Sequence, residues 1–108
     1  MSYQPTAFDA TLTSAAGSDT ALADELRAIF LSSARRQADL LRRSRCDANW
    51  RMAALRLRGL AASFHADDLL DLADAALAAA PGEPTVIRMI EQHFVLLDRP
   101  PHQVQSQP

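Results

Sequence analysis

The sequence lacks the features that mark secreted, membrane-bound and zinc-binding proteins. It has one cysteine among 108 residues, Cys46, which leaves no intrachain disulfide and no cysteine set for a zinc site. It has no basic start followed by an apolar run, and no apolar stretch of the roughly 18 residues that a membrane span needs. We therefore expect a soluble cytoplasmic protein with no membrane partner and no bound metal.

Signatures of catalysis and of β-strands are missing as well. The chain has no glycine-rich phosphate loop, nucleophile elbow or dinucleotide fingerprint, so we expect neither an enzyme nor a cofactor. It has only three glycines, and apolar residues do not alternate as they do in strands. Instead, alanine and leucine dominate an apolar content of 48%. Because both are strong helix formers, the sequence predicts one all-α domain.

The apolar spacing predicts a short first helix and a long second one. Phe8 and Leu12 indicate one or two helical turns, ended by Gly17, that cover one end of the domain as a lid. Ser18 or Asp19 then caps a helix of some 25 residues. The apolar rhythm of this long helix runs through Leu22, Leu26, Ile29, Phe30, Ser33, Gln37, Leu40 and Leu41. Its outer face is expected to carry Arg27, Arg35, Arg36, Arg42 and Arg43.

Three further helices complete the predicted fold. The first is capped by Asp47, the next opens with Asp67 and Asp68 at its positive end, and the last begins at Pro84. Short connections between amphipathic helices are typical of an up-down-up-down four-helix bundle, here with the N-terminal lid helix. We expect the bundle over residues 7–98, an N-terminal arm over 1–6 and a disordered tail over 99–108.

The helix that Asp47 is expected to cap, residues 50–65, has two apolar faces. At roughly 100° per residue, one broad face is predicted to be buried. It carries Trp50, Ala53, Ala54, Leu57, Ala61 and Phe64. The opposite side holds a second row, spaced by three and four residues and edged by arginines, which predicts an outward contact surface. This surface consists of Arg51, Met52, Leu55, Arg56, Arg58 and Gly59.

The segment Ala54-Leu55-Arg56-Leu57-Arg58-Gly59 resembles the signature of histidine-containing phosphotransfer (HPt) domains. That signature reads alanine, histidine, any residue, leucine, lysine, glycine. Leu55 stands where the family carries its phospho-accepting histidine, Arg58 stands where it carries lysine, and Gly59 matches the glycine that leaves room for a docking receiver domain. The resemblance implies an HPt-like bundle and a role in a two-component phosphorelay. Leucine has no nucleophilic atom, so it also implies a pseudo-HPt protein that binds a response-regulator receiver domain without accepting phosphate.

The arginines favour an acidic partner. Eight of the eleven lie between Arg35 and Arg58 beside only two aspartates, so that segment carries +6 and the remainder carries −8. A nucleic-acid reader would need polar side chains in the middle of the outward face, where this helix has Met52, Leu55 and Gly59. We therefore expect a protein partner, either a receiver domain or a signalling protein associated with a histidine kinase, and no nucleic acid.

Two alternatives remain open from the sequence. The chain is an active phosphocarrier if His65 or His93 accepts phosphate, whereas His102 falls in the expected tail. At 1.5 Å per residue, His65 lies about 15 Å along the axis from Leu55 and cannot share its docking point. His93 is expected at the edge of the core. Otherwise the chain is a helical structural or dimerisation module, although the leading interpretation is a monomer.

Overall fold

The computed structural model describes residues 6–99, which form five helices and contain no strand. The all-α prediction is therefore confirmed over this part of the chain. Of the expected arm and tail, only Thr6 and Arg99 are described, and the remaining residues of both segments lie outside the described range. The helices are α1 (Ala7–Ala16), α2 (Thr20–Arg42), α3 (Asp47–Ser63), α4 (Asp67–Ala78) and α5 (Pro84–Leu97).

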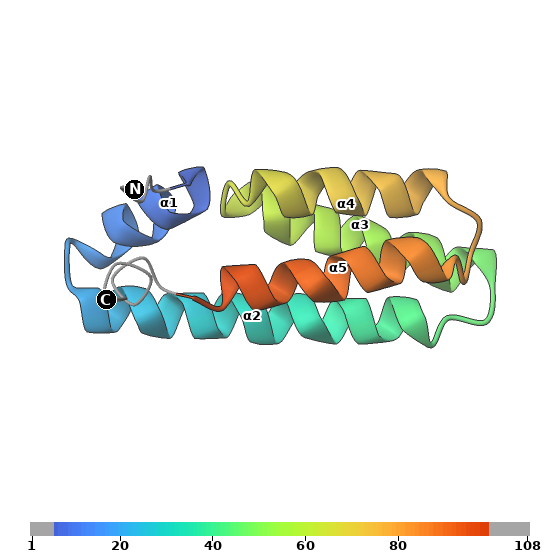
Figure 1. Cartoon of the computed structure of the whole chain (residues 1–108), viewed down its shortest axis with the longest axis horizontal. Helices are drawn as coiled ribbons and strands as arrows, with labels where there is room; N and C mark the ends of the chain where they lie inside the picture. Colours follow the sequence, from blue (N-terminus) through green and yellow to red (C-terminus); the bar gives the residue numbers. More distant parts are fainter. Residues whose placement is uncertain (1–5, 100–108) are drawn as a thin grey trace.

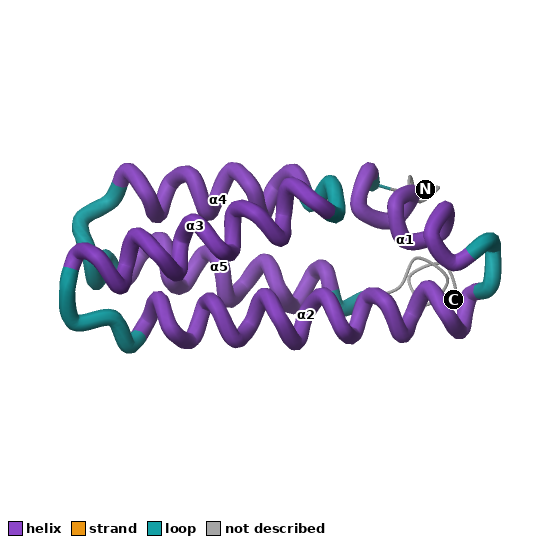
Figure 2. Tube along the Cα trace, turned by 180° about the vertical axis from the view of Figure 1, so that it is seen from behind, coloured by secondary structure: helices purple, strands orange, loops and turns teal. Residues whose placement is uncertain are grey.

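Helices α2 to α5 lie side by side and alternate in direction (Figures 1 and 2). Helix α2 contacts α3, α3 contacts α4, α4 contacts α5, and α5 returns to contact α2. This cycle of contacts encloses the core. Helix α2 extends beyond the other three, and α1 folds back along its N-terminal part (Figure 1).

Local sequence explains where the helices begin and end. The Asp19 side chain accepts a hydrogen bond from the Leu22 amide at the start of α2, as predicted. Gly17 ends α1 with φ of 62°, a left-handed conformation that favours glycine. One capping prediction is wrong: Cys46, not Asp47, is the N-cap of α3, and Asp47 is the first helical residue. There its charge still suits the positive end of the helix.

The core is built from all five helices. Its largest fully buried side chains are Phe8, Leu12, Phe30, Leu31, Leu41, Leu57, Leu69 and Ile90. Trp50 is buried at 3% exposure, and its indole Nε1–H donates to the Ala76 carbonyl at 2.8 Å. This bond satisfies the one polar atom of the side chain and ties α3 to α4.

The predicted buried face of α2 is wrong in part. Ile29 is 62% exposed, and Leu22 and Leu40 are 39% and 38% exposed. The buried row instead includes Ala34 and Ala38, which let neighbouring helices approach closely. Arg27, expected on the outer face, is only 5% exposed. At 100° per residue, the buried face is thus turned by roughly a quarter of a circle from the predicted one.

Arg27 is buried because α1 supplies its counter-charge. Its Nη2 donates to Asp9 Oδ1 at 2.5 Å, and its Nη1 donates to the Leu97 carbonyl at 2.7 Å. Its guanidinium also lies 5.2 Å from the ring centre of Phe8. Asp9 in turn accepts from the Thr6 amide in a capping box. Helix α1 is thereby joined to both α2 and α5.

Helix α1 is longer than the one or two turns predicted, with ten residues. Aromatic packing extends its attachment: the rings of Phe8 and Phe30 lie 4.9 Å apart, and Phe30 is equally close to Phe64. These contacts connect α1, α2 and the end of α3. The position of α1 at one end of the other helices agrees with the predicted lid.

Candidate partner-binding face of helix α3

Helix α3 turns one face inward and leaves the other in solvent. The predicted inner residues Trp50, Ala53, Ala54, Leu57 and Ala61 are all buried, and Phe64, just past the helix end, is half-buried. On the outer side, Met52 is 52% exposed and Leu55 is 45% exposed. The predicted outward orientation of Leu55 is therefore confirmed. We call Met52, Leu55 and Gly59 the outer strip.

Gly59 leaves open space on this strip. A Cβ atom placed on it would meet nothing within 4 Å, so no neighbouring helix requires a glycine there. A glycine within a helix costs about 1 kcal/mol of stability relative to alanine. The packing of this chain therefore does not account for Gly59, whereas a closely approaching partner would.

The arginines around the outer strip fall into two groups. Among the described residues, Arg51 and Arg56 form no ion pair, so their guanidinium groups are available to a partner. Arg58 differs, because its Nε donates to Asp74 Oδ1 of α4 at 2.6 Å. Both members of this pair are about half exposed, so the pair contributes little stability and a partner can displace it. The sequence did not anticipate this contact.

Shallow hollows flank the outer strip. One, of about 430 Å³, lies between α2 and α3, where Met52 and Arg56 face Leu40 and Arg43. A second, of about 390 Å³, is lined by Arg51 and Leu55 together with Met52 and Arg56. An apolar side chain of a partner can enter either hollow while its carboxylates meet the arginines. Leu40 and Arg43 extend the candidate face onto α2, beyond the predicted residues.

The positive charge at the C-terminal end of α2 is partly neutralised by ion pairs within the chain. Arg42 and Arg43 both pair with Asp39, at 2.5 Å and 3.0 Å. The hydrogen bond from Arg42 is the main reason that the pKa of Asp39 is lowered. Arg36 and Arg45 form no ion pair among the described residues. Between residues 35 and 58, the arginines without an ion pair in the described structure are therefore Arg36, Arg45, Arg51 and Arg56.

Neither described histidine lies on this face. His65 is exposed just beyond the end of α3, with a left-handed φ of 56°. His93 is half-buried on α5, as predicted, and burial is the main reason that its pKa is lowered from the usual 6.5. His102 lies outside the described range. Over residues 6–99 the structure contains no group of side chains arranged to hold a metal ion, and no helix long and apolar enough to cross a membrane.

Comparison with known proteins finds no family model, no curated protein and no solved structure that matches this chain.

Proposed function

We propose that this chain is a degenerate, HPt-like protein that binds a response-regulator receiver domain without accepting phosphate. In this proposal helices α2 to α5 form the up-down-up-down bundle of that family, and the protein acts in the cytoplasm as a monomer. Bound to a receiver, it competes with the true phosphodonor or serves as an adaptor. The single observation that carries the proposal is the exposed row of Met52, Leu55 and Gly59 on a segment that resembles the HPt signature.

The chemistry of the face supports binding without transfer. In HPt domains a histidine nitrogen attacks the phosphorus atom of the receiver's aspartyl phosphate. By the resemblance, Leu55 stands where that histidine would be, and its side chain is exposed but has no lone pair to form the bond. What it offers is apolar area, which contributes about 25 cal/mol per Å² buried before the costs of association.

The arginines beside the strip supply the complementary charge. Arg51 and Arg56 have no ion pair among the described residues, and guanidinium groups bind carboxylates in a bidentate manner. The resemblance implies a receiver domain as the partner, and the phosphorylation site of a receiver domain is rich in carboxylates. Apolar contact in the middle and arginine contacts at the sides favour such a surface over nucleic acid, which would leave Met52 and Leu55 against phosphates.

The sharpest test restores the missing nucleophile. We expect Leu55→His to accept a phosphoryl group from a phosphorylated receiver: the N–P bond forms on the imidazole, and the receiver's aspartate is released as a carboxylate. Acid-labile phosphate on residue 55, detected by mass spectrometry after incubation with the host's phosphorylated receivers, is the expected result. The matched control is Met89→His, which places a histidine at a similarly exposed position, 49%, on α5.

Two outcomes would count against the proposal. Equal labelling of Leu55→His and Met89→His would mean that no receiver docks specifically on α3. Phosphate on His65 or His93 of the unaltered chain would favour the phosphocarrier alternative instead. We further expect Gly59→Arg, introduced together with Leu55→His, to abolish labelling by blocking close approach, with an unchanged helical circular-dichroism spectrum.

A further inference from the structure

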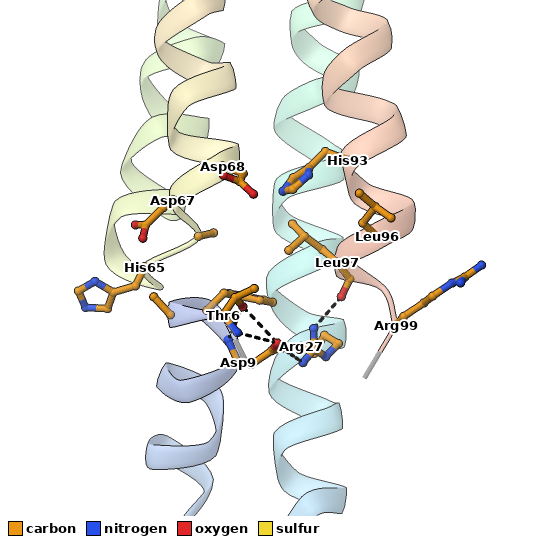
Figure 3. Close-up of a pocket in the computed structure, with 13 residues that line it drawn as sticks. Thr6, Asp9, Arg27, His65, Asp67, Asp68, His93, Leu96, Leu97 and Arg99 are labelled. Carbon is orange, nitrogen blue, oxygen red and sulfur yellow. Dashed lines mark hydrogen bonds and ion pairs between the residues drawn. The ribbon is translucent and has the colours of Figure 1, made fainter. Parts of the chain in front are cut away.

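A cavity of about 510 Å³ lies at the end of the molecule that α1 covers. It is bounded by the start of α1, the turn between α3 and α4, and the last turns of α5 (Figure 3). Its volume falls within the range typical of small-molecule sites, about 300–1,000 Å³. No residue of the outer strip lines it.

The floor of this cavity consists of one ion pair, whose two charges compensate each other, and of apolar groups. The Arg27–Asp9 ion pair lies across the bottom, and the Leu97 side chain points inward above it (Figure 3). Phe8, Ala66 and Leu96 add apolar surface to the lining. A ligand that reaches this floor therefore gains stability from apolar contact and not from ionic contact with Arg27.

The walls differ from the floor because they carry polar groups without partners. Asp68 of α4 and His93 of α5 point toward one another across the cavity (Figure 3). Neither side chain forms a hydrogen bond or ion pair among residues 6–99, and the two side chains are too far apart for a direct salt bridge. Burial lowers the pKa of His93, so near neutral pH its ring offers an acceptor nitrogen.

The charge at the mouth of the cavity is negative. Asp67 and Asp68 both line it, and no basic side chain of the described chain pairs with either of them. Arg27 is committed to Asp9, and Arg99 points away from the cavity (Figure 3). A positively charged group is thus favoured in the space between Asp68 and His93, and an anion is disfavoured.

We propose that this cavity binds a small organic amine, with its ammonium group between the Asp68 carboxylate and the His93 imidazole and its apolar body against Phe8 and Leu97. The N–H groups of the ammonium donate to both side chains, and the apolar body replaces water on the floor. The site is separate from the outer strip and does not depend on the proposed receiver binding.

The test uses three six-carbon probes whose head groups are cationic, neutral and anionic: hexylammonium, 1-hexanol and hexanoate. Each is titrated into the full chain labelled with ¹⁵N and followed through its backbone amide resonances. We expect hexylammonium to shift amides of residues 65–68 and 93–97 and to bind roughly two- to five-fold more tightly than hexanol, with hexanoate the weakest. No saturable shifts, or shifts scattered over the whole surface, would overturn the proposal.

A matched pair of variants assigns the charge effect. Asp68→Asn keeps the side-chain shape but removes the carboxylate. We expect this variant to bind hexylammonium only as tightly as hexanol and to bind hexanol with unchanged affinity. Asp71→Asn removes a charge from an exposed residue of the same helix that does not line the cavity, and it should retain the preference. Equal losses in the two variants would mean that general surface charge attracts the amine, and would refute the site.

Discussion

The outer face of α3 and the junction between α1 and α2 use the same residue type in opposite ways. At the junction, Arg27 is buried, paired with Asp9 and bonded to the Leu97 carbonyl. On α3, Arg51 and Arg56 are exposed and have no pair among the described residues. At the junction, the charge of Arg27 helps to hold three helices together. On the outer face of α3, the charges of Arg51 and Arg56 and the outer strip are left exposed to solvent.

The contrast separates residues that the fold requires from those that it does not. Removing a side chain from the junction leaves a buried group without its partner, while the outer face of α3 has little that folding depends on. The fold does not explain Met52, Leu55 and Gly59, and our proposal assigns these residues to a contact with a partner. The comparison can be tested through stability in both regions.

The largest effect is expected at the buried ion pair. Asp9→Leu leaves the Arg27 guanidinium uncompensated inside the protein, which costs about 3–5 kcal/mol of unfolding free energy. Arg56→Met, on the exposed face, should change it by no more than about 0.5 kcal/mol. Urea unfolding followed by circular dichroism measures both. Similar losses of unfolding free energy in the two variants would show that the fold depends on both regions alike.

The double variant Asp9→Leu/Arg27→Met sharpens this result. With both charges gone, no buried ion remains unpaired, and the Nε of Arg27, which is buried without an acceptor in the described structure, is removed as well. We expect the double variant to be more stable than Asp9→Leu alone. Additive losses would instead show that the two side chains act independently.

An intermediate effect, of opposite sign in the two regions, is expected for the glycines. Gly17→Ala places a side chain at a φ of 62° and should destabilise the protein by about 1–2 kcal/mol. Gly59→Ala adds a Cβ that meets nothing within 4 Å and should stabilise it by about 0.5–1 kcal/mol. Thermal unfolding of the two variants gives both signs. A destabilising Gly59→Ala would mean that the fold itself uses this glycine.

The smallest effect concerns pH. Burial lowers the pKa of His93 below 6.5, the value expected in the unfolded chain, and the charge of Asp68 partly opposes this shift. Below about pH 6.5 the unfolded state therefore binds more protons, and stability is lost as the pH falls through the pKa of the folded state. Urea midpoints at pH 7.5 and pH 5 should differ less for His93→Gln than for the unaltered chain.

A second variant checks the cause of that shift. Asp68→Asn removes the charge that raises the His93 pKa, so an NMR titration of the imidazole should show a lower pKa than in the unaltered chain. An unchanged value would mean that the two side chains do not interact across the cavity.

Sequence patterns predicted the helices better than they predicted the face that one of them buries. Gly17, Asp19 and Pro84 mark helix ends by local chemistry, and the structure places them there. In α2 the large side chains of Leu22 and Ile29 suggested the wrong row, because alanines occupy the tightly packed side. Small residues carry little hydrophobic signal even where close packing makes them essential.

The sequence predicted the site residues that lie within α3 but not the residues that α2 and α4 contribute beside them. Spacing by three and four placed Met52, Leu55 and Gly59 together because a helix fixes its own geometry. Spacing within one helix does not reveal that Asp74 of α4 pairs with Arg58, or that Leu40 of α2 borders Met52. The cavity beside His93 was missed for the same reason, since it is formed by segments far apart in the sequence.

The single tryptophan gives the molecule its own optical reporter. Trp50 sits in a dry environment with its indole N–H bonded to the Ala76 carbonyl, on the side of α3 opposite Leu55. Its fluorescence should shift to longer wavelength when water enters the core, and stay nearly constant when something merely covers the far side of the helix. One emission spectrum therefore distinguishes a variant that is unfolded from one that is folded but no longer binds its partner.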